Sequence, residues 1–221
     1  MEKAYLVLEN RDVFEGYRIG SHRDSVGELV FTTGMVGYPE TLTDPSYAGQ
    51  IVIQTFPLIG NYGIIEEDFE GKCAVNGYIV REMCDKPSNF RCQYTLERFL
   101  KENDIPGICG IDTRALTKIL REEGVMNACI CSSVDEAEMG RIYKAISDYS
   151  VKGVVSRVSR KENEFFKADG EGKYKVTLID YGAKQNIIRS LQKLGCDVTV
   201  VPQDTAAEEI LDMAPDGIML S

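Results

Sequence analysis

The chain has a single histidine, so any nucleophile that needs an imidazole base must use His22. His22 stands between Ser21 and Arg23 in a stretch rich in strand-forming residues, and a lone histidine with polar neighbours is more often a surface residue than a catalytic base. There are seven cysteines, none in a Cys-x-x-Cys pair and none with an identifiable activating neighbour. Cys129 and Cys131 share one face of an apolar strand, which indicates packing rather than a metal site. The residue types therefore predict no catalytic dyad and no metal centre.

Two polar segments remain as candidate ligand sites. Asp180-Tyr181-Gly182 lies where an expected strand ends and its helix begins, which is where α/β folds place ligands, but a tight strand-to-helix turn with a flexible Gly182 is the favoured interpretation. Asp44-Pro45-Ser46 is typical of a turn, in which Pro45 fixes φ and Asp44 or Ser46 caps backbone donors. Alternatively, the Ser46 hydroxyl could hold the amino or carboxylate end of an amino-acid ligand, because it both donates and accepts hydrogen bonds. No phosphate-binding glycine motif is present in the sequence.

The composition limits the function classes. Hydrophobic residues make up 43% and charged residues 27% of the chain, as in ordinary globular proteins, and the formal net charge is −10. Such an acidic surface disfavours nucleic acid and anionic membranes as partners. The apolar run from Ala4 to Leu8 is too short for a signal-peptide core, and no run approaches the length of a membrane span. A cytoplasmic protein with reduced thiols is therefore expected.

The first 80 residues predict a β-rich domain with short strands separated by turn formers. Further along, apolar periodicity predicts helices over Thr95–Glu102 and Thr113–Glu123, the second capped by Asp112 or Thr113 and ended by Gly124. A strand is expected over Asn127–Cys131, followed by a helix capped by Ser133. The strands expected in the first 80 residues are Ala4–Leu8, Val13–Tyr17, Glu28–Thr33, Ile51–Phe56 and Cys73–Val80.

The apolar periodicity is lost from Ser156 to Lys175, and we expect residues 153–174 to be a linker. Beyond it, strand and helix patterns alternate with largely apolar strands, which is typical of a parallel sheet wound right-handedly. Three strands cannot cover both faces of such a sheet, so we expect this domain to be incomplete. Its expected elements are Val176–Asp180, Ala183–Leu194, Asp197–Val201, Thr205–Met213 and Gly217–Leu220.

Long stretches of the chain resemble the small, glutamine-hydrolysing subunits of carbamoyl-phosphate synthetase. The matching stretches run from Gly27 through Gln50-Ile51-Val52 to Ile59-Gly60-Asn61-Tyr62-Gly63, then Ser88–Arg91, Pro106–Gly124 and Asp180–Leu191. The resemblance implies an α/β protein with the family's β-rich β/β/α domain over residues 1–152. It also implies a linker over 153–174 and the start of a class I glutamine amidotransferase domain, flavodoxin-like with a parallel sheet, over 175–221.

The same resemblance implies a reaction. In this family a Cys-His-Glu triad hydrolyses glutamine to glutamate and ammonia, and the ammonia passes to the large subunit. The large subunit, which carries ATP and Mg²⁺, makes carbamoyl phosphate from bicarbonate for pyrimidine and arginine biosynthesis. The implied partners are the large subunit and L-glutamine, with no nucleic acid, no membrane and no cofactor in this chain itself.

Carried over residue by residue, the resemblance assigns one site residue. Ser46 matches the serine with which the family's N-terminal domain helps bind glutamine. None of the seven cysteines matches the nucleophile, so no catalytic residue is assigned, and we expect the chain to be an N-terminal fragment without its triad. Two alternatives stay open: a non-catalytic module that docks on the large subunit, and a free-standing α/β ligand binder.

Overall fold

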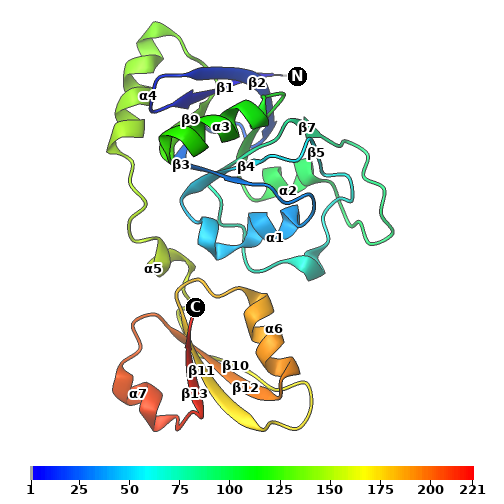
Figure 1. The fold of residues 1–221 in the computed structure, drawn as a ribbon, viewed down its shortest axis with the longest axis vertical. Helices are drawn as coiled ribbons and strands as arrows, with labels where there is room; N and C mark the ends of the chain where they lie inside the picture. The colour runs from blue at the N-terminus through cyan, green and yellow to red at the C-terminus, as the bar shows by residue number, and fades with distance from the viewer. Residues whose placement is uncertain (1) are drawn as a thin grey trace. The chain divides into compact units, whose positions relative to one another are not determined.

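The computed structural model describes residues 2–221, and these form two compact units (Figure 1). The second unit comprises Gly153–Ser221 together with two short segments, Asp44–Ser46 and Glu70–Lys72. The first unit comprises the rest of the chain up to Lys152. The two units are described separately below.

The first unit is built on a closed β-barrel with the strand order β1-β2-β8-β6-β4-β3-β9. The three parallel pairings, β3 with β4, β4 with β6 and β6 with β8, follow one another around the barrel, and the other neighbours pair antiparallel. Closure leaves no unpaired strand edge. The strands are β1 (Lys3–Leu8), β2 (Val13–Gly20), β3 (Ser25–Thr32), β4 (Gln50–Gln54), β6 (Gly77–Ile79), β8 (Pro106–Cys109) and β9 (Met126–Cys131).

Apolar side chains that alternate along the strands fill the barrel. Leu6 and Leu8 of β1 pack with Leu29 of β3 and Ile51 and Ile53 of β4, all fully buried. The helix α3 (Thr113–Glu123) adds Leu116 and Leu120 to this core. This burial of aliphatic side chains is the main stabilising contribution to the first unit.

Three more helices and a short two-stranded sheet complete the first unit. A second buried cluster joins the barrel strands to α1 (Tyr38–Thr43) and α2 (Leu96–Glu102), with Tyr38 and Phe99 among its large side chains. The helix α4 (Glu136–Asp148) packs Ile142 and Ile146 against Cys129 and Cys131 of β9. The small sheet pairs β5 (Leu58–Ile59) with β7 (Glu82–Met83).

The helix ends test the capping expectations. The Thr95 hydroxyl accepts a hydrogen bond from Arg98 N, and Asp112 caps α3, whose last turn ends at Gly124 with a φ of 92°. The prediction that Ser133 caps the next helix is wrong. Helix α4 begins at Glu136 after Asp135, while the Ser133 hydroxyl accepts from Asp135 N and so closes a turn that precedes the helix.

The second unit holds a four-stranded sheet with the order β10-β12-β11-β13. The strands β11 (Tyr174–Asp180), β12 (Cys196–Pro202) and β13 (Gly217–Leu220) are parallel, as the sequence predicts, and β10 (Glu164–Phe166) joins antiparallel at the edge. The helix α6 (Gln185–Lys193) packs Ile188 against Leu178, Val198 and Val200.

The chain of the second unit winds as expected for a parallel sheet. In Figure 1 the strands of this unit lie between α6 and α7 (Ala207–Asp212), which follow β11 and β12 respectively. Residues 153–174, expected as a linker, contain the helix α5 (Val154–Val158) and the edge strand β10.

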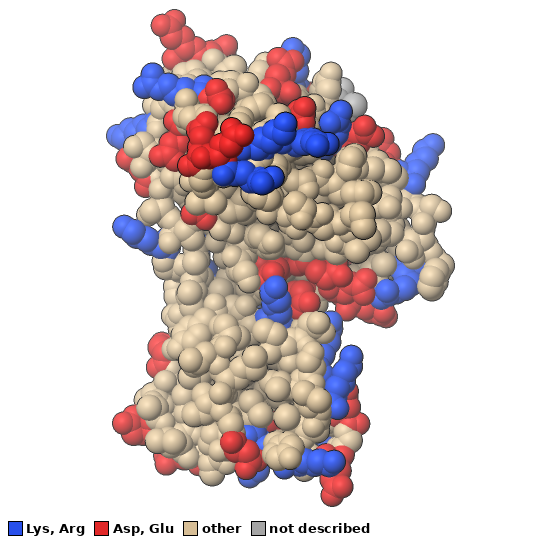
Figure 2. Space-filling view, in the orientation of Figure 1, with Lys and Arg blue, Asp and Glu red and all other residues tan. Residues whose placement is uncertain are grey.

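Charge is spread over the surface. On the face shown in Figure 2, Lys and Arg side chains lie beside Asp and Glu side chains rather than forming a uniformly basic surface. Among residues 2–221, none of the helices combines the length and apolar composition that crossing a bilayer requires.

Candidate functional site

Ser46 lies in the 3₁₀ turn Pro45–Tyr47, which directly follows α1. Residue 46 is exposed, and its backbone N–H donates to Asp44 Oδ1 at 2.9 Å. Within the described residues, the Ser46 hydroxyl makes no hydrogen bond, so Asp44 alone supplies the side-chain cap of this turn. The turn therefore presents a hydroxyl with its hydrogen-bonding capacity available to a ligand.

Asp44, unlike Ser46, is buried and doubly engaged. While its Oδ1 accepts from Ser46 N, its Oδ2 lies 2.8 Å from Lys184 Nζ. The Asp44 side chain is 9% exposed and that of Lys184 is 43% exposed, so the ion pair joins a buried carboxylate to a partly solvated ammonium group.

The second unit thus brings together the two polar segments singled out in the sequence. Pro45 packs close to Gly182, where a Cβ atom would lie 3.2 Å from Pro45 Cβ and 3.1 Å from Val158 Cγ2. Gly182 also has a φ of +114°, a conformation that side-chain-bearing residues rarely adopt. The contact between these two turns therefore requires a glycine at position 182.

Asp180 holds the second of these turns in shape. Its Oδ1 accepts from Gly182 N at 2.9 Å and from Ala183 N at 2.7 Å, while its Oδ2 accepts from Arg160 N at 2.8 Å and Arg160 Nη1 at 3.1 Å. Burial alone would raise the pKa of Asp180, but the hydrogen bonds from Ala183, Arg160 and Gly182 and the charge of Arg160 bring that pKa below its usual value. The ionised carboxylate is thus a structural anchor for the segment that leads to Lys184.

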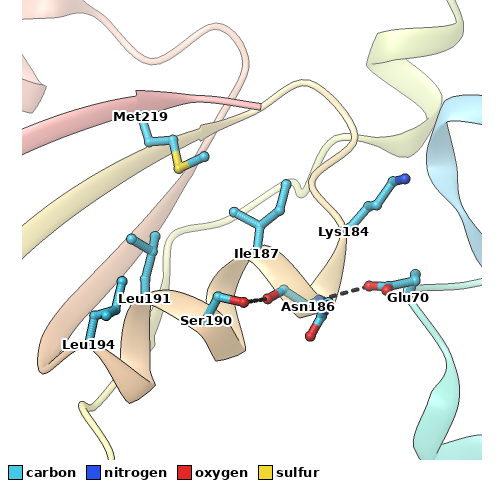
Figure 3. Close-up of a pocket in the computed structure, with 8 residues that line it drawn as sticks. All are labelled: Glu70, Lys184, Asn186, Ile187, Ser190, Leu191, Leu194 and Met219. Atoms are coloured by element: carbon cyan, nitrogen blue, oxygen red, sulfur yellow. Dashed lines mark hydrogen bonds between the residues drawn. The ribbon is translucent and has the colours of Figure 1, made fainter.

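A groove runs along α6 in the second unit (Figure 3). It has a volume of about 420 Å³, and Glu70 and Lys184 lie at one end. The rest is lined by the apolar side chains Ile187, Leu191, Leu194 and Met219 and by the polar Asn186 and Ser190. Glu70 caps α6, because its carbonyl oxygen accepts from Gln185 N at 2.9 Å and its Oε2 accepts from Asn186 N at 2.8 Å. The Ser190 hydroxyl in this groove donates to Asn186 O at 2.7 Å, and no histidine or cysteine lines the groove, so it offers no nucleophile–base pair.

His22 and the thiols lack the geometry of a catalytic pair. His22 is 70% exposed and its Nδ1 lies 3.0 Å from Glu2 Oε2. All seven cysteines are free. Burial raises the pKa of Cys73 to about 12 and raises that of Cys109, so both thiols stay protonated at neutral pH. Over residues 2–221, no group of three or more His, Cys, Asp or Glu side chains could hold a metal ion.

Sequence reasoning named Asp44 only as a turn cap and did not connect it to Lys184. These two residues are 140 positions apart, and neither spacing nor periodicity relates them. Arg160 and Glu70 were also missed, since a single arginine or glutamate in a polar stretch carries no pattern of its own.

Comparison with known proteins places these segments in a family. The profile of "Carbamoyl-phosphate synthase small chain, CPSase domain" matches residues 6–130, and that of "Glutamine amidotransferase class-I" matches residues 177–221. The chain belongs to the carbamoyl-phosphate synthase small-chain family. The family resemblance stated from the sequence is therefore confirmed, as is a mixed α/β fold with a β-rich N-terminal domain and amidotransferase strands after it.

Curated members of the carbamoyl-phosphate synthase small-chain family match along the whole chain. The carbamoyl phosphate synthase small chain of Clostridium perfringens is 53% identical over 220 residues, which are 99% of this chain and 62% of that protein. The small chain of Listeria innocua is 49% identical over 224 residues, 100% of this chain and 60% of its own length. The chain thus spans about 60% of the length of these relatives.

One solved structure, an aminopeptidase from Aneurinibacillus sp. strain AM-1, aligns with 93% of this chain and 49% of its own. Its TM-score is 0.34 and its sequence identity is 13%.

Proposed function

We propose that this chain acts as part of the glutamine-hydrolysing subunit of a carbamoyl-phosphate synthase. In the whole protein, glutamine would be hydrolysed to glutamate and ammonia, and the ammonia would be used by a large synthetase subunit. That subunit would bind ATP and Mg²⁺ and convert bicarbonate and ammonia into carbamoyl phosphate, for pyrimidine and arginine biosynthesis. Family membership over the full 221 residues supports this assignment.

The role proposed for this chain in glutamine binding is carried by Ser46. Its hydroxyl lies on an exposed turn whose own donor is satisfied by Asp44, so the hydroxyl is available to the polar end of an amino-acid ligand. Ser46 also lies within the part of the chain that the small-chain profile matches. We therefore assign Ser46 to the binding of L-glutamine.

We assign no catalytic step to residues 1–221 themselves. The solvent-exposed His22 pairs with Glu2, and the raised pKa values of Cys73 and Cys109 argue against a thiolate nucleophile at either position. The seven free thiols fit a reducing compartment, and we place the protein in the cytoplasm.

Reconstitution tests this proposal. The full-length chain, purified with a large synthetase subunit, is expected to support carbamoyl phosphate formation from glutamine, bicarbonate and ATP, whereas the large subunit alone should use only free ammonia. A full-length chain that binds the large subunit but never confers glutamine-dependent synthesis would make it a docking module without a glutaminase role.

A further inference from the structure

We infer that Asp44 is a positioning residue for glutamine binding, which acts by holding the backbone of Ser46 through one carboxylate oxygen and by pairing with Lys184 through the other. This inference rests on the proposed function, because it assigns a second residue to the site in which Ser46 is proposed to act.

Asp44 and Ser46 have different roles in the turn that they share. In a turn of the Asp-Pro-Ser type, either polar side chain can cap the backbone donors. Here Asp44 Oδ1 accepts from Ser46 N at 2.9 Å, whereas the Ser46 hydroxyl makes no hydrogen bond within residues 2–221. Because Asp44 caps the turn, the hydroxyl of Ser46 is available to a ligand.

Asp44 is also buried and paired. A buried carboxylate is costly unless both oxygens are satisfied. Asp44 is 6% exposed, and its second oxygen lies 2.8 Å from Lys184 Nζ. One carboxylate thereby links two turns, because Lys184 lies two residues after Gly182, the last residue of the Asp180-Tyr181-Gly182 turn.

The partner turn is rigid. Asp180 accepts two backbone N–H groups of that turn, from Gly182 and Ala183, and the close contact between Gly182 and Pro45 brings the two turns together. Lys184 is thus held by a defined backbone. A ligand group bound at Ser46 would meet a serine whose backbone is held by Asp44, and Asp44 is held in turn by Lys184, which lowers the ordering cost of binding.

The test uses the full-length chain assembled with its large synthetase subunit, with the glutamine KM and the ammonia-dependent rate measured for each variant. Asp44→Ala removes the cap and the ion pair, and should raise the glutamine KM about three- to tenfold while the ammonia-dependent rate is unchanged. Asp44→Asn keeps an acceptor for Ser46 N but loses the charge beside Lys184, so its KM should lie between those of the wild type and Asp44→Ala.

The double variant Asp44→Ala with Ser46→Ala separates positioning from an independent contribution. If Asp44 acts through Ser46, the double variant should show the KM of Ser46→Ala alone rather than the product of the two single effects. A control is Asp112→Ala in the first unit, where Asp112 Oδ1 accepts from Arg114 N and Ala115 N in a comparable turn. This control should lower stability and leave the glutamine KM unchanged.

Each remaining outcome is decisive. Multiplicative effects on the glutamine KM in the double variant would overturn this inference and leave the proposed function standing. An unchanged KM in Asp44→Ala together with a raised KM in Ser46→Ala would do the same. If Asp44→Ala lowers the ammonia-dependent rate together with the glutamine-dependent rate, Asp44 has a purely structural role and the inference is wrong. An unchanged KM in Ser46→Ala would instead overturn the glutamine-binding role of Ser46, and the Asp44 inference with it.

Discussion

Asp180 shows how one buried carboxylate fixes a turn and makes it sensitive to acid. The ionised form accepts from three backbone N–H groups and from Arg160, and its pKa is lower in the folded chain than in an unfolded one. The stability that this ionised form contributes is complete above the ordinary aspartate pKa of about 3.9 and is lost as the pH falls through the lower folded value.

We expect Asp180→Asn to lower the free energy of unfolding of the second unit by about 1–3 kcal/mol at neutral pH, because the half-buried donors of Arg160 lose their anionic acceptor. The difference between wild type and variant should shrink as the pH falls below about 4, because the Asp180 carboxyl is protonated first in the unfolded chain and then, at its lower folded pKa, in the folded chain. Chemical denaturation across this pH range checks both points. A difference that stays constant with pH would mean that the charge of Asp180 does not contribute.

At the site, the sequence identified single residues but not their pairing. The Asp180 turn was named from the short-range signature of a strand-terminal Asp-x-Gly, whereas the local Asp-Pro-Ser pattern indicated a turn and Ser46 was assigned from the family resemblance. The Asp44–Lys184 pair forms only when two turns that are distant in the sequence fold together, and no local pattern in a single sequence relates positions 44 and 184.

The N-terminus of helix α1, which leads into Asp44, is capped by a distant tyrosine side chain rather than by a residue next to the helix in the sequence. The Tyr62 hydroxyl oxygen accepts from Gly37 N at 2.7 Å and from Tyr38 N at 3.3 Å, and the Tyr62 ring stacks on that of Tyr38 at 4.3 Å. Burial raises the pKa of Tyr62, so the hydroxyl stays protonated at neutral pH.

Tyr62→Phe should keep the ring stacking and lose the cap, and we expect it to destabilise the first unit by about 0.5–2 kcal/mol. Thermal unfolding, followed by a probe of the barrel, measures the effect. Tyr94→Phe serves as the control, since its hydroxyl bonds an exposed Glu66 and its loss should cost less. Equal stability of Tyr62→Phe and wild type would show that water replaces the tyrosine cap at no cost.

Two glycines of the first unit should respond in opposite directions to alanine. Gly140 lies within α4, and an added Cβ would meet no atom within 4 Å, so Gly140→Ala should stabilise the chain by about 0.5–1 kcal/mol. At Gly63 the added Cβ would lie 2.2 Å from Cys92 Sγ and the φ is +71°, so Gly63→Ala should destabilise it. Urea denaturation of both variants distinguishes the two cases, and a loss of stability in Gly140→Ala would contradict the assignment of open space there.

Elements with strong local patterns were predicted well, and elements set by tertiary pairing were not. The amphipathic helices α2 and α3 lie within one residue of their predicted bounds. By contrast, β8 (Pro106–Cys109) was missed, because its Pro-Gly start is typical of a turn and only its pairing with β2 and β6 makes it a strand. The strand expected over Cys73–Val80 is limited to β6 (Gly77–Ile79), where partners in the barrel are available.

The two units differ in how much apolar surface they bury. The first unit has three clusters of buried hydrophobic side chains, whereas the second has one, of six buried residues. The strand β13 also exposes Ile218 and Leu220, at 53% and 66%. Local stability follows the density of buried contacts, so the second unit should open more readily.

Hydrogen exchange of the 221-residue chain measures this difference directly. Amides of β11, β12 and β13 should exchange faster than those of the barrel strands β1, β3 and β9 under the same conditions. Equal protection of the two sets of amides would contradict this expectation and would mean that other interactions compensate for the smaller hydrophobic core of the second unit.

The central claim, that Ser46 binds glutamine, is tested most directly by kinetics of Ser46→Ala in the full-length chain with its large subunit. Loss of one hydrogen bond to a charged ligand end is worth roughly 1.5–3 kcal/mol, so the glutamine KM should rise about ten- to a hundredfold. Synthesis from free ammonia should be unchanged, because ammonia bypasses the glutaminase site. If the ammonia-dependent rate instead falls in step with the glutamine-dependent rate, Ser46 is a structural residue of its turn and the claim is wrong.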